Sequence, residues 1–304
     1  MIILVAPGQG SQTPGFLEPW LDVDGVREHL ETLSDASGVD LIKHGTVSDA
    51  DTIRDTEIAQ PLIVAASIVT GSLLVNNRRS SVGAVAGHSV GEFAAAYVAG
   101  ILSDTDAIRL VGVRGRAMAN EASKVATGMS AVLGGEPEVL HARLSELGLT
   151  AANMNGGGQV VVAGELEALA YLAAEPAAGT RVIPLQVAGA FHTAFMAGAV
   201  DTLREAASTV EPKDPTVSIY TNRDGSRVTS GPDYLELLIG QVSNPVRWDL
   251  CMEAFAAEGV TGFIELAPAG ALVGLVKRGI KGLPTVAVKT PDDLTEAVEL
   301  LEAS

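Results

Sequence analysis

The fold of this chain is decided by the stretch Val82-Gly83-Ala84-Val85-Ala86-Gly87-His88-Ser89-Val90-Gly91-Glu92. It places a G-x-S-x-G pattern between an apolar run that is typical of a strand and a segment, Glu92 to Val98, that favours a helix. A strand, a sharp turn and a helix form the context in which this pattern presents a nucleophilic serine. Because glycines at 87 and 91 allow a tight turn, we expect Ser89 to be exposed at the start of the helix, beside backbone N–H groups.

The overall charge of the chain is strongly acidic. Its 304 residues include 20 Lys plus Arg against 37 Asp plus Glu, which gives a formal net charge of −17. This balance disfavours nucleic acid and anionic membranes as partners, because both attract basic surfaces. An anionic substrate must therefore be bound by a few local cations. The length suffices for one large domain or two smaller ones with a sizeable core.

Three further features concern the cellular compartment and metal binding. Cys251 is the single cysteine, so the chain can form neither an internal disulfide nor a thiolate metal site. The N-terminal run Met1–Ala6 lacks a basic region and has the pattern of a first strand, not of a signal peptide. The longest apolar region, Pro61 to Val75, is interrupted by small polar residues and falls short of the roughly 18 continuous apolar residues of a membrane span. We therefore expect a cytoplasmic protein without a membrane span or a metal.

Apolar periodicity divides the chain into alternating strands and helices. We expect strands near residues 2–6, 216–220, 262–266 and 285–289, and helices near 23–37, 60–75, 104–120, 196–209, 234–241, 248–257 and 271–278. Such alternation predicts an α/β fold with a mainly parallel sheet that is covered by helices on both faces.

A different arrangement begins near Ser123. A strand, a helix, two strands, a helix and a strand are expected in turn, at residues 129–133, 137–147, 150–155, 159–163, 165–174 and 181–187. This β-α-β-β-α-β order is typical of a ferredoxin-like unit. We therefore expect a large domain made of residues 1–122 and 191–304, into which a small subdomain of residues 123–190 is inserted.

A serine nucleophile needs a base, and the chain has five histidines. His192 lies in the small-residue loop 187–193, between the insertion and a helix, where it can reach the mouth of the parent sheet. The alternative is a hydrogen-bonded interior histidine. His29 and His141 lie in charged helices and His44 lies in a polar stretch, so solvation is expected for them. His88 is next to the serine in the chain, where a packing role is expected. The nearest acid candidate, Asp201, follows His192, whereas the hydrolase order places the acid before the histidine. We expect a Ser–His dyad whose imidazole is oriented by a backbone carbonyl.

Arg114 occupies an unusual position for a charged residue. On the helix expected after Ser103 it falls on the apolar stripe, in line with Leu110, Val111 and Met118. A buried guanidinium requires an anionic or carbonyl-rich partner. Position alone leaves two alternatives open, an internal salt bridge or a bidentate site for a substrate carboxylate.

The loop Pro7-Gly8-Gln9-Gly10-Ser11-Gln12 follows the first strand, so it opens at the same end of the sheet as Ser89. It lacks the third glycine of a dinucleotide fingerprint and the Gly-Lys-Ser/Thr of a Walker loop. Its glycines can instead bring the Gln9 N–H toward the nucleophile. Together with the Val90 N–H it would then form an oxyanion hole.

These features occur together in one family. In order along the chain they are Pro7-Gly8-Gln9-Gly10-Ser11-Gln12, Gln60-Pro61, Gly87-His88-Ser89-Val90-Gly91-Glu92, Val113-Arg114-Gly115, Phe191-His192 and Asn244-Pro245-Val246-Arg247-Trp248. The set resembles the malonyl-CoA:acyl carrier protein transacylases over essentially the whole chain, especially their stand-alone actinobacterial type. It is also similar to the acyltransferase domains of polyketide and fatty acid synthases. The resemblance implies an α/β-hydrolase-like core with an inserted ferredoxin-like subdomain.

The resemblance also implies a role for each matching residue. Ser89 would be the nucleophile, His192 the base and Arg114 the ligand of the malonyl carboxylate. Gln9 and Val90 would provide the two amides of the oxyanion hole. Gln60 would line the acyl pocket, and Gln241 would provide the carbonyl that orients the histidine. Phe191 resembles the malonyl-selective form, in which a bulky ring crowds the α-carbon. Asn155 matches a substrate-binding position, although Gly156-Gly157-Gly158 replace the Ser-Pro-Gly that frequently follows it in the family.

The activity that the resemblance implies is transfer of a malonyl group from malonyl-CoA, through a malonyl-serine, to the phosphopantetheine thiol of acyl carrier protein. No cofactor is needed, the enzyme is expected to be a monomer, and the product would serve fatty acid or polyketide biosynthesis. Because such carrier proteins are acidic, docking would need a basic cluster, and Lys277, Arg278 and Lys281 are the best candidate. The alternative is that these cations only complement a helix C-terminus.

Two other functions remain open at the level of the sequence. A serine esterase or thioesterase can be built on the same turn, but it would require an acid partner and no inward arginine. A carrier-protein-binding module without catalysis would need neither Ser89 nor His192.

Overall fold

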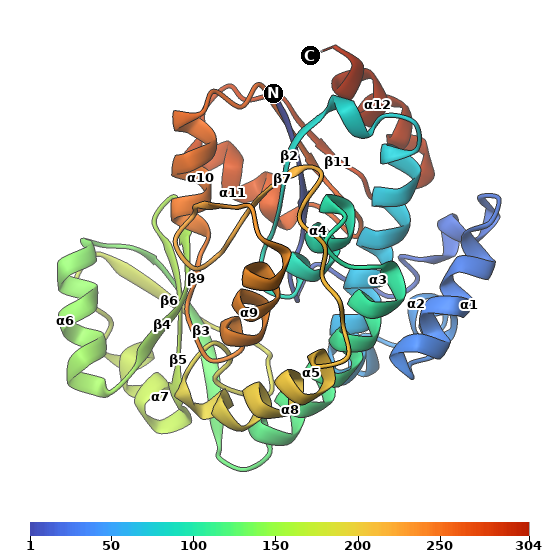
Figure 1. Ribbon diagram of the computed structural model, residues 1–304. Coiled ribbons are helices and arrows are strands. Elements are labelled where there is room, and N and C mark those ends of the chain that lie inside the picture. Colours follow the sequence, from blue (N-terminus) through green and yellow to red (C-terminus); the bar gives the residue numbers. More distant parts are fainter. Residues whose placement is uncertain (304) are drawn as a thin grey trace.

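The computed structural model describes residues 1–303 and has a mixed α/β fold with two sheets (Figure 1). The larger sheet has six strands in the order β11-β10-β1-β2-β7-β8. Their bounds are β1 Ile2–Ala6, β2 Val82–Gly87, β7 Ser218–Tyr220, β8 Arg227–Val228, β10 Gly262–Glu265 and β11 Thr285–Ala287. Neighbouring strands from β11 to β7 are parallel, and β8 runs antiparallel to β7. The expected mainly parallel sheet is therefore present.

Helices cover both faces of this sheet. Side chains along β1 alternate between two hydrophobic clusters, because successive residues of a strand point to opposite faces. The first cluster contains residues of α1 Val26–Ser37, α2 Leu41–Thr46, α3 Thr56–Val75, α4 Gly91–Ala99, α5 Asp104–Ala122, α8 Ala197–Ala207, α9 Gly231–Gln241 and α12 Leu294–Glu302. The second contains residues of α10 Trp248–Ala257 and α11 Ala271–Gly279. Burial on both sides explains why β1 and β2 are apolar almost throughout.

Helix α3 is a core helix. It begins at Thr56, earlier than the predicted residue 60, because the Asp55 side chain accepts a hydrogen bond from the Glu57 N–H and caps the first turn. With this turn the helix reaches 20 residues, and its most apolar window of 18 residues has a mean hydropathy of 2.0, so by length and composition it could cross a membrane. However, 83% of its most apolar window is buried inside the protein, and this packing accounts for its composition.

The smaller sheet has five strands in the order β6-β3-β5-β4-β9, of which β9 is orange in Figure 1 because it comes from a later part of the chain. The bounds are β3 Thr127–Gly134, β4 Thr150–Gly156, β5 Gln159–Glu165, β6 Thr180–Pro184 and β9 Val246–Arg247, with helices α6 Pro137–Leu147 and α7 Leu166–Ala174 between the strands. The predicted β-α-β-β-α-β order is confirmed. The fifth strand is a finding beyond the prediction, since β9 comes from a distant part of the chain and pairs parallel to β4.

Several predicted boundaries were wrong. Strand β6 ends at Pro184 instead of 187, because the chain leaves the sheet there and Leu185 and Val187 turn to line a cavity. Helix α2 and helix α12 were missed, although α2 has an Asp40 cap and α12 has apolar residues at helical spacing. The remaining helical elements are 3-10 turns at Glu18–Asp22, Thr52–Arg54, Arg79–Ser81, Ala194–Met196 and Pro291–Asp293.

Close backbone contacts form the turn after β2. A Cβ atom on Gly87 would overlap the backbone of Gly91, and one on Gly91 would overlap the carbonyl oxygens of Ala6 and Pro7. The turn therefore requires glycine at both positions. Between them Ser89 has a φ of 52°, a left-handed conformation that residues with a side chain rarely adopt. The predicted strained turn is present.

Replacing Gly91 by alanine should destabilise the protein, because the new methyl group would overlap the end of β1. Overpacking of this kind costs about 1–3 kcal/mol, so we expect a melting temperature lower by several degrees. The matched control is Gly240→Ala, since a Cβ there would have no heavy atom within 4 Å. Thermal unfolding of both variants checks the prediction, and equal melting temperatures would contradict it.

Candidate active site

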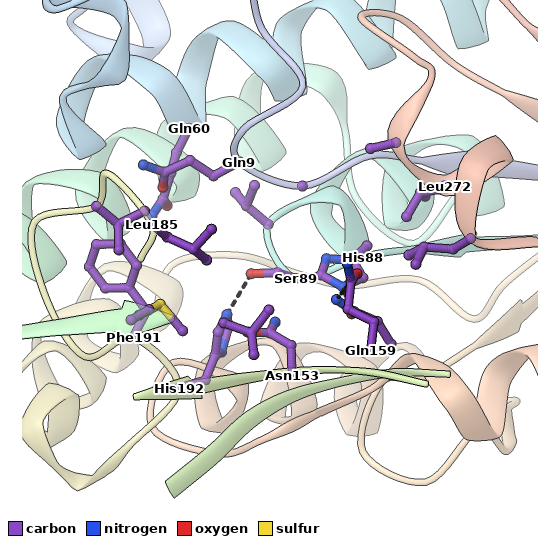
Figure 2. Close-up of a pocket in the computed structure, with 18 of the residues that line it drawn as sticks. Gln9, Gln60, His88, Ser89, Asn153, Gln159, Leu185, Phe191, His192 and Leu272 are labelled. Atoms are coloured by element: carbon purple, nitrogen blue, oxygen red, sulfur yellow. Dashed lines mark hydrogen bonds between the residues drawn. The ribbon is translucent and has the colours of Figure 1, made fainter. Parts of the chain in front are cut away.

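Ser89 and His192 form a hydrogen-bonded pair (Figure 2). The turn between β2 and α4 presents the Ser89 hydroxyl, and its Oγ lies 2.7 Å from Nε2 of His192. His192 comes from the loop after β6 and is separated from Ser89 by 103 positions in the chain. The sequence reasoning thus chose the histidine that the fold brings to the serine.

The orientation of His192 is fixed by a backbone carbonyl. Its Nδ1 lies 2.8 Å from the carbonyl oxygen of Gln241, and because that oxygen only accepts, Nδ1 carries the proton. Nε2 is then free to accept the proton of Ser89. No carboxylate within residues 1–303 bonds His192, and Asp201 is exposed on α8. The geometry is that of the expected dyad.

His192 should remain neutral well into the acid range. Its side chain is buried, and burial, followed by the positive charge of Arg114, lowers its pKa to about 3. A histidine must be neutral to accept a proton from serine, so this shift favours a base that is ready at neutral pH.

Modification of Ser89 by a neutral sulfonyl fluoride should therefore keep a constant rate as the pH falls from about 8 to about 5. An ordinary histidine would lose half of its neutral form near pH 6.5, but the pKa of His192 is lowered to about 3. The measurement is the pseudo-first-order rate of labelling by intact mass, with His192→Ala as the control that should label slowly at every pH. A midpoint near pH 6.5 in the native protein would contradict the prediction.

Gln9 and Val90, the residues predicted to form an oxyanion hole, line the same cavity as Ser89. Gly8 packs directly on the turn, since a Cβ there would lie 2.9 Å from the carbonyl oxygen of His88. This close approach brings the next residue, Gln9, to the wall of the same cavity as Ser89 and Val90. The N–H groups of Gln9 and Val90 have no acceptor within residues 1–303. They are therefore available to an oxyanion, and the predicted oxyanion hole stays a prediction.

Arg114 is buried without a salt bridge. It is 1% exposed on α5, and its guanidinium donates to Oε1 of Gln60 at 2.6 Å and to Oε1 of Gln241 at 3.0 Å. Its Nε has no partner within residues 1–303, and no carboxylate there forms an ion pair with it. Burial lowers its pKa to about 10, which leaves it charged at neutral pH. Of the two alternatives, the internal salt bridge is wrong.

One cavity of about 370 Å³ brings the predicted residues together (Figure 2). Eight of the predicted residues line it, namely Gln9, Gln60, Ser89, Val90, Arg114, Asn155, Phe191 and His192. Gln241 lies behind this wall and acts on it only through its hydrogen bonds. The wall includes residues of the smaller sheet, so the cavity lies between the two sheets.

Asn155 lines the cavity from β4 but both ends of its amide are bound. Its Oδ1 lies 2.8 Å from Nε2 of His88, and its Nδ2 donates to Oε1 of Gln159 at 3.0 Å. His88 also packs edge-on against Trp248, with ring centroids 5.7 Å apart. The expected packing role of His88 is therefore accompanied by a hydrogen bond across the cavity wall.

Sequence reasoning missed two residues that support the turn. The Asn222 side chain accepts from the Ser89 N–H at 2.8 Å and donates to the Gly87 carbonyl at 2.7 Å. The Asn222 N–H in turn donates to Glu92 at 2.7 Å. A usable signal was present in both cases, since Asn222 is a polar residue just after a buried strand and Glu92 is a carboxylate in an otherwise apolar helix.

Known proteins share this sequence and this fold. The chain matches the family model described as acyl transferase domain over residues 3–296. It is 46% identical over 304 residues to the malonyl CoA-acyl carrier protein transacylase of Mycobacterium tuberculosis, with 99% of this chain and 100% of that protein covered. The Escherichia coli K12 protein of the same name is 32% identical over 303 residues, with 97% and 98% covered.

Solved structures give the same result. The crystal structure of MCAT from Mycobacterium tuberculosis superposes with a TM-score of 0.95 at 46% identity and covers 98% of this chain and 99% of that one. The PlMCAT:AntF complex, a type II PKS acyl-carrier protein with its malonyl-transacylase, gives a TM-score of 0.92 at 30% identity, with 98% and 99% covered. The family resemblance read from the sequence is therefore confirmed, and this chain belongs to the acyl transferase domain family.

Proposed function

We propose that this chain transfers a malonyl group from malonyl-CoA to the phosphopantetheine thiol of an acyl carrier protein. The observation that carries the proposal is a single cavity that contains both the Ser89–His192 pair and the buried guanidinium of Arg114. A buried cation without a carboxylate partner favours an anionic substrate, and malonyl-CoA has a free carboxylate at the end of its acyl group. The names of the relatives, malonyl CoA-acyl carrier protein transacylase, agree with this substrate.

In the first half-reaction the malonyl carboxylate binds Arg114 and the thioester carbon lies next to Ser89 Oγ. His192 Nε2 takes the hydroxyl proton as Oγ attacks this carbon, and the N–H groups of Gln9 and Val90 donate to the oxyanion. Each such donor typically contributes about 3 kcal/mol. As the C–S bond breaks, the imidazolium returns the proton to the sulfur of CoA, and a malonyl ester remains on Ser89.

The second half-reaction runs through the same groups in reverse. The phosphopantetheine thiol gives its proton to His192 and attacks the ester carbon, and the same two N–H groups bind the new oxyanion. The C–O bond to Ser89 then breaks, and His192 returns the proton to Oγ. Every proton taken by His192 is thus returned within one half-reaction, so the proposal requires no metal and no redox cofactor.

The walls of the cavity favour malonyl over branched acyl groups. Phe191 adjoins His192 and is 6% exposed, so its ring occupies space that a methyl branch on the α-carbon would need. Gln60 lines the same cavity and accepts a hydrogen bond from the Arg114 guanidinium at 2.6 Å, which holds that group in the wall. Asn155 is proposed only as part of the wall, since its amide is already bound to His88 and Gln159.

An acidic carrier protein would dock beside the mouth of the cavity. Lys277, Arg278 and Lys281 are exposed at the end of α11, and Arg278 also lines the cavity. With a net charge of −17, the rest of the protein surface would repel an acidic carrier protein, so binding of the carrier protein requires a local basic cluster. The solved complex of a malonyl-transacylase with an acyl-carrier protein agrees with this class of partner.

We also propose the finer architecture and the setting of the enzyme. The strand order β6-β3-β5-β4 and a separate hydrophobic cluster favour a ferredoxin-like subdomain at residues 123–190. Residues 1–122 and 191–304 would then form an α/β-hydrolase-like domain around the larger sheet. We propose that the enzyme is a cytoplasmic monomer.

A serine esterase or thioesterase is not favoured, although it would use the same turn. The His192 ring is held by a carbonyl in place of a carboxylate, and a buried arginine in the acyl pocket would serve no neutral ester. A binding module that lacks catalysis would not need the 2.7 Å contact between Ser89 and His192.

Incubation with malonyl-CoA followed by intact mass measurement should separate these functions. A malonyl adduct that persists, and that is discharged by added phosphopantetheinylated carrier protein, is the expected result. Free malonate released at the rate of CoA, with no adduct, would instead indicate a thioesterase. No adduct and no release would indicate a binding module.

A further inference from the structure

The buried carboxyl group of Glu92 takes no part in the chemistry proposed above. It lies in the first turn of α4, is 1% exposed, and forms no salt bridge within residues 1–303. One oxygen accepts a hydrogen bond from the Asn222 N–H at 2.7 Å, and the other accepts a short hydrogen bond from Nε2 of Gln241. Burial of a carboxyl group without an ion pair is costly, so its presence beside the active site requires an explanation.

Gln241, at the end of α9, connects Glu92 to the active site. Its backbone oxygen accepts from Nδ1 of His192 at 2.8 Å, and its Oε1 accepts from Arg114 at 3.0 Å. Its Nε2 donates to the Ser89 carbonyl at 3.0 Å and to Glu92. One residue thus contacts the base, the cation and the nucleophilic turn, and Glu92 binds that residue without lining the catalytic cavity.

We propose that Glu92 is a positioning residue, which fixes the side-chain amide of Gln241 and thereby holds the Arg114 guanidinium in place. The inference rests on the proposed function, because it takes Arg114 as the site of the malonyl carboxylate. Its basis is the number of donors and acceptors: an ionised carboxylate only accepts, and the Asn222 N–H and Nε2 of Gln241, which contact its two oxygens, only donate. The Tyr234 hydroxyl also interacts with this carboxyl group and can donate to it. With Nε2 bound to Glu92, Oε1 of Gln241 must face Arg114.

Glu92→Gln tests this arrangement because it keeps the size of the side chain and replaces one acceptor by an NH₂ donor. That NH₂ must face either the Asn222 N–H or Nε2 of Gln241, and two donors form no hydrogen bond. The backbone of Asn222 is fixed, whereas the Gln241 side chain can rotate. Rotation would turn its Nε2 toward Arg114 and remove one of the two acceptors of the guanidinium. Binding of the malonyl carboxylate should then be weakened more than binding of an acyl group that has no carboxylate.

The pH dependence gives a second readout. Burial raises the pKa of Glu92 to about 8, against the hydrogen bonds from Asn222, Gln241 and Tyr234 and the charge of Arg114. Tyr234 on α9 and Cys251 on α10 also face it, and burial raises the pKa of both, so they stay neutral while Glu92 ionises. A protonated carboxyl group has an O–H donor on one of its two oxygens, at a position where the amide of Glu92→Gln has its NH₂ donor. Preference for malonyl should therefore rise with pH through about 8 in the native enzyme and not in the variant.

The experiment compares kcat/KM for malonyl-CoA with that for acetyl-CoA, which lacks the carboxylate, at about pH 6 and about pH 9. At the higher pH we expect the malonyl-to-acetyl ratio of Glu92→Gln to be at least about tenfold below that of the native enzyme, and at the lower pH to be similar. Gly240→Ala, next to Gln241 and with no heavy atom within 4 Å of the new Cβ, should match the native enzyme.

A double variant shows whether Glu92 acts through Gln241. Gln241→Met removes the amide but keeps the backbone carbonyl that accepts from His192, and Glu92→Gln added to it should lower the ratio no further. Equal losses for both substrates in Glu92→Gln, additive losses in the double variant, or a native ratio that is constant with pH would overturn the inference. The pH dependence is measured on the native enzyme, so this test does not depend on whether a variant folds. A native enzyme that transfers no malonyl group at all would instead remove the proposed function.

Discussion

Replacing Ser89 by alanine should abolish the malonyl adduct and lower the rate of malonyl transfer by about 10⁴- to 10⁶-fold. The reason is that Ser89 Oγ is the atom 2.7 Å from the His192 base, and without it no covalent intermediate can form. Arg114 and the N–H groups of Gln9 and Val90 remain, so malonyl-CoA should still bind. Intact mass after incubation with malonyl-CoA and transfer to carrier protein are the two measurements.

Ser208→Ala is the matched control for this substitution. Ser208 is exposed at the end of α8, and its hydroxyl donates only to the carbonyl of Glu205. That variant should acquire one malonyl group and transfer it at the native rate. A malonyl adduct on Ser89→Ala would show that another residue is the nucleophile, and the assignment of Ser89 would have to be abandoned.

The residues proposed to carry the chemistry have local signals in the sequence, and the structure brings them to one cavity. Ser89 is identified by its own pentapeptide between a strand and a helix, and the structure has it at a φ of 52° on the expected turn. Arg114 is identified by a conflict between its type and its place on an apolar helical stripe. His192 needed one further step, the elimination of the four other histidines. The roles of the remaining site residues came from the family resemblance.

The residues that hold this chemistry in place could not be predicted in the same way. Asn222 and Glu92 meet across a separation of 130 positions, and they do so only because β2 and β7 are neighbours in the sheet. Chain order does not determine which strands pair. The side chain of Gln241 is a similar case, since its contacts with Ser89 and Arg114 arise from the place where α9 ends.

The fold shows the same division between local and tertiary signals. The β-α-β-β-α-β order of the smaller unit was read from periodicity, whereas β9 was not, because two residues have no period. Its pairing with β4 connects residues 246–247 to the inserted segment and lies close to the Asn222 turn, where the Arg247 N–H donates to the Asn222 carbonyl at 2.8 Å. This short strand is one of the contacts that join the two sheets beside the cavity.

Replacing Arg114 by alanine should lower kcat/KM for malonyl-CoA by about 10²- to 10³-fold and leave that for acetyl-CoA nearly unchanged. Loss of one partner of a buried, hydrogen-bonded charge pair costs about 3–4 kcal/mol, which corresponds to that range. Acetyl-CoA has no carboxylate and forms no such pair. The measurement is transfer to carrier protein at saturating carrier concentration with each acyl-CoA.

Two further variants separate charge from packing. Arg114→Met fills most of the volume without a charge and should behave as Arg114→Ala does, whereas a loss confined to Arg114→Ala would indicate a cavity effect. Arg116→Ala removes an exposed arginine of the same helix, which donates only to the Ser37 carbonyl, and should keep the native preference for malonyl. With a net charge of −17 the protein offers an anion no general attraction, so the proposal assigns malonyl selectivity to Arg114, the buried cation of the cavity. Native malonyl transfer by Arg114→Met would therefore refute the carboxylate site and, with it, the positioning role of Glu92.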